Sequence, residues 1–155
     1  MPRKVWVAAA VLAVFVVGMV TISFATTPQV TSSTRVHVIE HAKTDKVVET
    51  GRAGDSSGDL LTFHNPVFDA ANARWVGHDQ GDCIRIAPRA GSWECRWVTF
   101  LNGGSITVEG PFYDTRGSVL AITGGTGLYR NARGAMVLRA RSGGTEYDFI
   151  FNIVP

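Results

Sequence analysis

Apolar and polar residues alternate along short segments of the C-terminal two-thirds of the chain, from Gly58 to Ile153. A period of two is typical of strands with one buried face, and Gly, Pro, Asn or Asp bounds each segment. The pattern predicts strands at 35–40, 59–68, 73–76, 82–87, 93–102, 105–113, 118–123, 135–141 and 145–153. The polar stretch from Ala42 to Gly58 is expected to be a long loop.

These strands predict an all-β domain, because no long stretch after the N-terminal segment carries the apolar stripe of an amphipathic helix. A closed antiparallel barrel and an open sandwich both fit the spacing of the strands. We favour the barrel, since several strands carry large residues on both faces, as when a partner subunit covers the outer wall.

The N-terminus has the pattern of an export signal. Met1 to Lys4 is basic, Val5 to Phe24 contains no charge, and Ser23-Phe24-Ala25 has the small-x-small form of a cleavage site. Residues 1–25 are thus predicted to be a signal peptide. If the segment stays uncleaved, residues 5–24 form a membrane anchor helix, because about 20 apolar residues can cross a bilayer.

In both cases the chain is predicted to be secreted or extracytoplasmic. Residues 26–34, rich in Thr and Ser, would form a flexible linker, and residues 35–155 the folded domain.

Cys83 and Cys95 are predicted to form a disulfide, because a pair of cysteines in an exported chain usually does. If they face each other across an antiparallel hairpin, Arg85 faces Trp93 and Gly81 faces Trp97. Such a register brings the two cysteines within disulfide distance. One face of this hairpin carries Cys83, Arg85, Trp93, Cys95, Trp97 and Thr99.

Charge and motifs exclude several functions. The net charge is +2 without a basic cluster, so no nucleic-acid partner is expected. His37 and His41 would lie about 13 Å apart on a strand, and no metal-binding spacing occurs, so no metal or other cofactor is expected. The glycines at 124–127 precede no helix with Lys-Ser/Thr, which argues for a bend at a barrel rim instead of a phosphate-binding loop.

Three segments resemble the allene oxide cyclases in order and spacing: residues 58–69, residues 77–83, and residues 107–112 leading to 120–127. The GGTG-x-Y-x-x-ARG run from Gly124 to Gly134 is also similar to the related dirigent proteins. The resemblance implies an eight-stranded antiparallel β-barrel of calycin-like type, usually a homotrimer. It also implies an apolar cavity that steers the cyclisation or stereoselective coupling of a small hydrophobic molecule.

Candidate catalytic residues follow from the resemblance. Glu40 matches a pocket glutamate that stabilises a developing cation, and Asn65 an asparagine that helps to hold an ordered water against the substrate oxygen. Cys83 matches a pocket cysteine, although a disulfide with Cys95 would remove its thiol. Ala42 replaces a second asparagine of the cyclases, and their following Ser-Pro pair is missing, so part of the water site is absent.

Predicted ligand-binding residues form the wall of the cavity: Phe63, Arg85, Trp93, Trp97, Tyr147 and Phe149. The aromatic side chains could instead fill the core. Three hypotheses therefore stand: a cyclase or coupling enzyme, a carrier without turnover, and a structural surface barrel packed solid. An interior below about 300 Å³ would end the first two hypotheses.

Overall fold

The computed structural model describes residues 33–154, so the predicted export segment and most of the predicted linker lie outside the described residues. The strands are β1 (Thr34–His41), β2 (Lys46–Val48), β3 (Leu60–Asp69), β4 (Trp75–Ala87), β5 (Ser92–Leu101), β6 (Gly104–Tyr113), β7 (Ser118–Gly125), β8 (Arg133–Arg141) and β9 (Glu146–Val154). Three single-turn 3₁₀ helices lie in connections: η1 (Pro88–Ala90), η2 (Gly127–Tyr129) and η3 (Ser142–Gly144).

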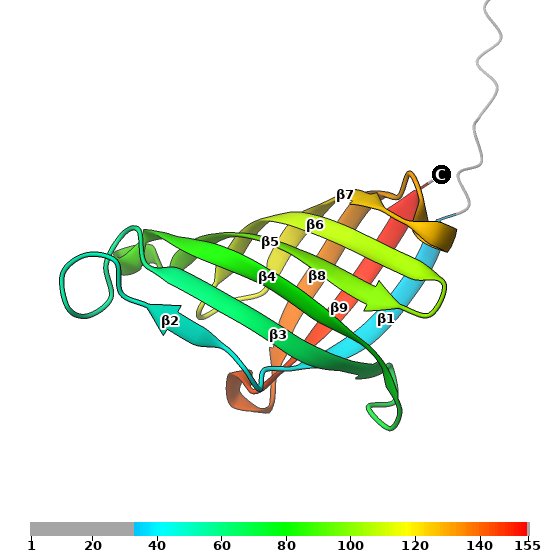
Figure 1. Cartoon of the computed structure of the whole chain (residues 1–155), viewed down its shortest axis with the longest axis horizontal. Coiled ribbons are helices and arrows are strands. Elements are labelled where there is room, and N and C mark those ends of the chain that lie inside the picture. The colour runs from blue at the N-terminus through cyan, green and yellow to red at the C-terminus, as the bar shows by residue number, and fades with distance from the viewer. Residues whose placement is uncertain (1–32, 155) are drawn as a thin grey trace, which may run out of the picture.

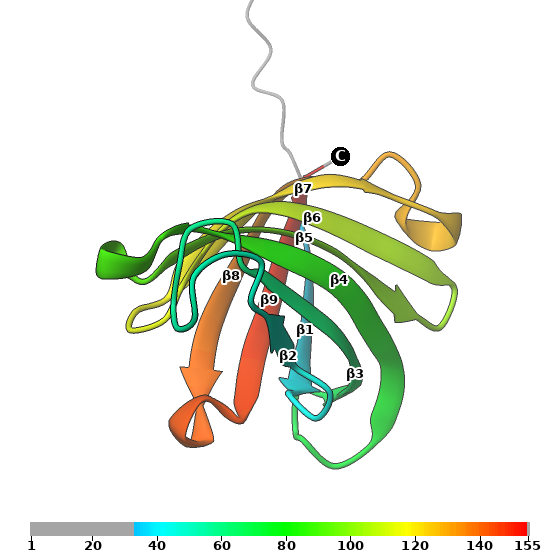
Figure 2. The same ribbon diagram turned by 60° about the vertical axis from the view of Figure 1, so that its left-hand side comes forward.

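The strands form one antiparallel sheet that closes on itself (Figures 1 and 2). The order is β1-β9-β8-β7-β6-β5-β4-β3-β2, and β1 also pairs with β3 through Val38, Ile39 and Glu40. The barrel therefore has eight strands, and β2 is an additional strand on β3. The predicted closed eight-stranded barrel is confirmed.

The stretch from Ala42 to Gly58 is not all loop, because it contains β2, whose residues pair with Leu60, Leu61 and Thr62 of β3. The prediction failed here because a strand of three residues is too short to show alternation. The pairing places β2 at one end of the barrel, where β1 has already left β3.

The two strands predicted at 73–76 and 82–87 are one continuous strand, β4. Gly77 and Gly81 suggested a break, but both lie in the ladder at places where the neighbouring strand comes very close. A Cβ on Gly77 would lie 1.9 Å from the carbonyl oxygen of Phe100, and one on Gly81 2.3 Å from the Cβ of Trp97. These glycines permit close packing of β4 against β5 and do not end the strand.

The β4–β5 hairpin has the predicted register: Cys83 pairs with Cys95, Arg85 with Trp93, and Gly81 with Trp97. Alternation along these strands points one set of side chains into the barrel. The inward side chains are buried, whereas Ile84, Glu94 and Arg96 on the other face are exposed. The buried set is Cys83, Arg85, Trp93, Cys95 and Trp97.

Apolar side chains pack one end of the barrel solid. Phe151, Ile106 and Val108 are fully buried there, together with Val67, Leu120, Ile122 and Met136. Because this end is filled, the space inside the barrel lies at the other end, at the β1–β2, β4–β5, β6–β7 and β8–β9 connections. A second hollow lies on the strands β3 to β6, with Thr62, Gln80 and Arg96 in its lining.

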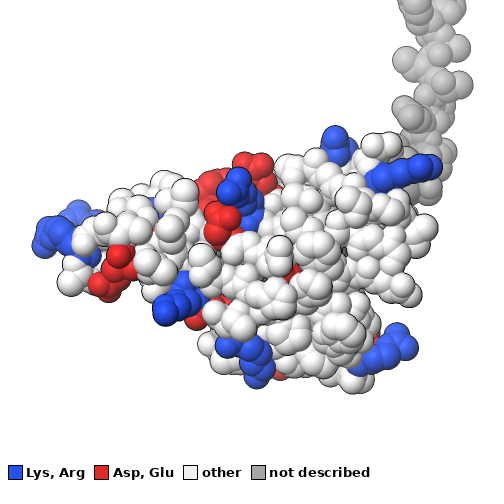
Figure 3. Space-filling view, viewed as in Figure 1, with Lys and Arg blue, Asp and Glu red and all other residues white. Residues whose placement is uncertain are grey.

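On the face seen in Figure 3, lysine and arginine side chains are scattered, several beside acidic ones, and no continuous basic patch forms. Within residues 33–154, no helix has the length and apolar character needed to cross a membrane.

Candidate functional site

The barrel holds a cavity of about 280 Å³ at the end opposite the packed core. This volume is slightly below the limit of roughly 300 Å³ given above, so the enclosed volume by itself favours the third hypothesis, a structural barrel. The exposed residues Asp45 and Val47 line one side of it, so the cavity opens to solvent and a ligand can extend beyond it. The lining residues are Glu40, Asp45, Val47, Leu61, Phe63, Cys83, Trp93, Cys95, Trp97, Phe112, Asp114, Leu138, Tyr147 and Phe149.

Strand alternation explains most of this lining. Leu61 and Phe63 of β3, Trp93, Cys95 and Trp97 of β5, and Tyr147 and Phe149 of β9 each lie two residues apart and so share the inner face of their strand. The aromatic rings stand at steep angles to one another. Phe63 and Trp97 are 5.9 Å apart between centroids at 73°, as are Phe112 and Tyr147.

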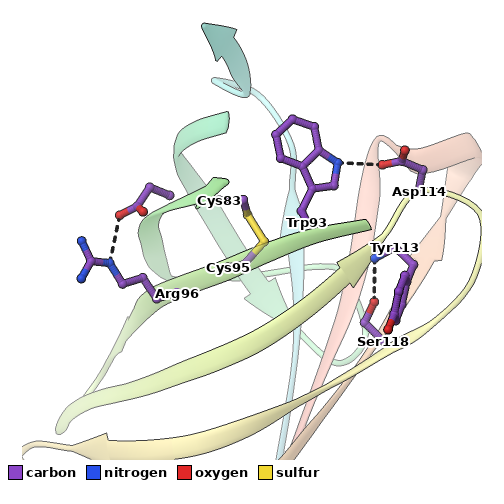
Figure 4. The surroundings of a disulfide bond; sticks show 8 residues. Cys83, Trp93, Cys95, Arg96, Tyr113, Asp114 and Ser118 are labelled. Carbon is purple, nitrogen blue, oxygen red and sulfur yellow. Dashed lines mark hydrogen bonds and ion pairs between the residues drawn. A yellow bond between two sulfur atoms is a disulfide. The ribbon is translucent and has the colours of Figure 1, made fainter. Parts of the chain in front are cut away.

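The disulfide between Cys83 and Cys95 is formed, with 12 residues of separation, and both sulfur-bearing residues are buried in the cavity wall. Figure 4 shows the disulfide beside Trp93, whose indole points toward Asp114. The described residues contain no free cysteine. The thiol that the resemblance to the cyclases implies is therefore absent in this oxidised state.

Glu40 is buried on β1 and receives a hydrogen bond on Oε1 from the side-chain amide of Asn65 on β3. The same amide nitrogen donates to Asp45 at 2.6 Å. The side-chain oxygen of Asn65 accepts from the backbone N–H groups of Lys43 and Thr44, each at 2.9 Å. Asn65 thus fixes the carboxyl group of Glu40 and the turn that carries Asp45.

Burial, followed by the charges of Asp79 and Asp45, raises the pKa of Glu40 to about 9, and the hydrogen bond from Asn65 opposes this rise. Burial likewise raises the pKa of Asp79 to about 7. Glu40 is consequently protonated at neutral pH. Among the described residues its Oε2 has no hydrogen-bond partner, and it is buried with almost no exposed surface.

Arg85 lies next to the cavity but does not line it. Its Nε and Nη2 donate to the two carboxylate oxygens of Asp55, both at 2.6 Å, and its Nη1 donates to Asp114 at 2.7 Å. The guanidinium carbon is 4.4 Å from the ring centroid of Trp93, and the Trp93 indole donates to Asp114 at 2.9 Å. Arg85 therefore ties the loop before β3 and the β6–β7 turn to the rim of the cavity.

The structure brings most of the predicted site residues together. Glu40, Phe63, Cys83, Trp93, Cys95, Trp97, Tyr147 and Phe149 line the cavity, whereas Asn65 and Arg85 stand behind it and position lining residues. Whether these residues bind a ligand or catalyse a reaction stays a prediction.

Sequence reasoning missed several lining residues. Phe112 has the strand parity of the inner face, which could have identified it, but Asp45 and Asp114 lie in turns with no periodic signal. Only closure of the barrel brings these two carboxylates to the same opening.

Solved structures of similar fold have been determined for enzymes of several kinds. Pyocyanin demethylase matches with a TM-score of 0.66 and 22% identity, covering 76% of this chain and 100% of that protein. A pterocarpan synthase dirigent protein matches with a TM-score of 0.66 and 18% identity, covering 88% and 97%. An exo-specific intermolecular Diels-Alderase matches with a TM-score of 0.63 and 16% identity, covering 80% and 99%.

At identities below 25%, these matches establish a shared fold. They do not establish a shared substrate. The sequence itself, however, matches the dirigent-like protein family from residue 20 to residue 153, which is most of the chain. By fold and by sequence this chain belongs to the dirigent-like protein family.

Proposed function

We propose that this dirigent-like barrel binds a small hydrophobic molecule in its cavity and steers the cyclisation or stereoselective coupling of that molecule. The observation that carries the proposal is the buried carboxyl group of Glu40, whose pKa burial raises to about 9, in a cavity with six aromatic side chains in its lining. Relatives of the same fold are named as a pterocarpan synthase and as a Diels-Alderase, which supports a ring-forming reaction.

The resemblance implied that Glu40 stabilises a developing cation. Because burial raises its pKa to about 9, we propose instead that Glu40 acts in its neutral form on a substrate oxygen. In the opening of an unsaturated epoxide, the C–O bond breaks and its electron pair stays on the oxygen, which the O–H group of Glu40 stabilises by a hydrogen bond. The carbon skeleton is left with a delocalised positive charge. Ring closure forms one C–C bond and the oxygen becomes a carbonyl, so the product is an isomer and no co-reactant is consumed.

The aromatic walls supply the stereochemical control. A flexible molecule held between Trp97, Phe149 and Phe63 has few conformers from which to close a ring. Well-oriented intramolecular reactions gain roughly 7 to 11 kcal/mol from proximity and orientation alone. Few catalytic residues are then needed.

The experiment is to incubate the full chain with a short-lived unsaturated epoxide that carries no carboxylate, generated in place, and to measure the ratio of product enantiomers. An excess of one enantiomer supports the proposal. Glu40→Gln keeps a hydrogen-bond donor at this position but lowers its acidity, so it should reduce the excess. A racemic product identical to the protein-free control would overturn catalysis on this substrate class.

Binding without turnover is the second candidate function. It is favoured by the disulfide at Cys83, which occupies the place of a thiol in the cyclases that the chain resembles. In that case small aromatic molecules should perturb Trp93 and Trp97 while product ratios stay unchanged.

We also propose that the domain acts outside the cytoplasm. The disulfide supports an oxidising compartment. Residues 1–25 would be the signal or anchor and 26–34 the linker before the domain at 35–155. The mass of the protein recovered from medium and from membranes tests cleavage, and sedimentation tests the predicted homotrimer.

A further inference from the structure

The cavity lining carries carboxyl groups of three residues and, among the described residues, no lysine, arginine or histidine side chain. Glu40 comes from β1, Asp45 from the β1–β2 turn and Asp114 from the β6–β7 turn. Asp45 and Asp114 are exposed at the open end. The titratable side chains of this lining are thus three carboxyl groups and the phenol of Tyr147, and none of them is basic.

The positive charge of Arg85 does not offset the acidic side chains of the cavity. Each of its three guanidinium nitrogens donates to a carboxylate, two to Asp55 and one to Asp114. One guanidinium is therefore matched by two carboxylates, so this cluster carries one net negative charge. Lys43, Lys46 and Arg116 lie near Asp45 and Asp114 in the sequence but do not line the cavity. Arg85 also lies against Trp93, outside the lining.

Aromatic rings surround the remaining space. The lining contains Phe63, Trp93, Trp97, Phe112, Tyr147 and Phe149. Trp97 and Phe149 are 5.3 Å apart at 38°, and the pairs Phe63–Trp97 and Phe112–Tyr147 are inclined at 73°. Aromatic side chains gathered around one space are the kind of lining that binds organic cations.

From these observations we infer that the cavity selects a flat organic cation, such as an N-alkylated heteroaromatic ring, over neutral and anionic molecules of the same shape. The inference rests on the small-molecule binding in the proposed function and concerns the charge of the ligand. A cation without an epoxide fits the second candidate function, binding without turnover. The aromatic walls and the carboxylates act in the same sense, because both stabilise positive charge on the ligand. A ligand carrying a free carboxylate or phosphate would meet like charge at the opening.

The test compares three bicyclic probes by titration calorimetry at pH 8 with the full chain: N-methylquinolinium, which is cationic, quinoline, which is neutral at this pH, and 1-naphthoate, which is anionic. Their shapes are close, so affinity differences report charge. We expect N-methylquinolinium to bind about tenfold tighter than quinoline, the size of a cation–π contact with partial desolvation. 1-Naphthoate should bind most weakly.

Two variants test the role of charge. Asp45→Asn keeps an oxygen that can accept the hydrogen bond from Asn65, so it should lower the affinity for the cation and leave quinoline unchanged. Glu94→Gln removes an acid from the exposed outer face of β5 and serves as the matched control. If Glu94→Gln weakens cation binding as much as Asp45→Asn, the preference arises from overall charge and the inference is overturned.

Location is tested by NMR without any cavity variant. A probe in the cavity should shift the indole N–H signals of Trp93 and Trp97 and leave that of Trp75, 61% exposed on β4, in place. If the cation shifts only Trp75, the assigned site is wrong. If quinoline or 1-naphthoate binds as tightly as the cation in the cavity, the charge inference falls and the proposed function stands. If no probe binds, the charge inference falls, and the epoxide experiment decides the proposed function separately.

Discussion

The side-chain amide of Asn65 donates a hydrogen bond to the carboxyl group of Glu40, linking β3 to β1 at the wall of the cavity. Asn65 is fully buried, and every polar atom of its side chain is bonded within the barrel or to the β1–β2 turn. This single residue therefore connects the candidate catalytic acid to the turn that carries Asp45.

Asn65→Ala should destabilise the protein by about 3 kcal/mol or more, because it removes several buried hydrogen bonds and leaves polar groups without partners. Urea unfolding measures this change. His64→Ala, at the exposed neighbouring position, is the control and should change the free energy of unfolding by less than about 0.5 kcal/mol. Equal effects of the two substitutions would contradict the central role of Asn65.

Stability should fall as the pH rises from about 4.5 to about 9. Glu40 and Asp79 have raised pKa values in the folded protein, so in this range the folded state holds protons that the unfolded chain has lost. Asp45, Asn65 and Tyr147 are the other groups that face Glu40. Unfolding free energies at pH 5, 7 and 9 measure the slope, which Glu40→Gln should flatten. An unchanged slope in that variant would show that Glu40 ionises normally.

Arg85→Met should destabilise the protein by about 2 kcal/mol or more and loosen the loop that contains Asp55, because a buried guanidinium with two carboxylate partners is lost. Limited proteolysis with trypsin at Arg52 reports the loop. Arg96→Met is the matched control, since Arg96 pairs with Asp82 on the exposed face and such pairs contribute below about 1 kcal/mol. Protection of Arg52 in both variants would contradict the prediction.

Gly81→Ala should be strongly destabilising, because its Cβ would lie 2.3 Å from the Cβ of Trp97 and 2.4 Å from the carbonyl oxygen of Arg96. Gly124→Ala is the control, with nothing within 4 Å of its Cβ. Thermal unfolding compares them. A stable Gly81→Ala protein would mean that β4 and β5 are not packed this closely.

Reduction of the disulfide should lower the free energy of unfolding by somewhat less than about 3 kcal/mol, the entropic estimate for a loop this short. Since the chain has only two cysteines, the effect of a reductant belongs to this bond. A variant with Cys83→Ser and Cys95→Ser should be insensitive to reductant. Unfolding curves with and without reductant measure both, and a reductant-insensitive wild-type protein would exclude the disulfide.

Local patterns in the sequence were sufficient to predict most strands, the disulfide and the β4–β5 register. Each of these features depends on neighbours in one strand or hairpin. Alternation determines which face of the sheet a residue lies on, and one known facing pair determines the other facing pairs of the same hairpin. The predicted break in β4 was wrong because the constraint on Gly77 and Gly81 comes from the adjacent strand.

The position and the lining of the cavity depend on the tertiary structure. Barrel closure through β1 and β3 brings Glu40 to Asn65, and it gathers Asp45 and Asp114 from separate turns at one opening. The role of Arg85 likewise depends on two loops that no periodic pattern describes. Contacts between distant segments depend on how the whole sheet curves and closes, so the alternation within any one strand does not contain them.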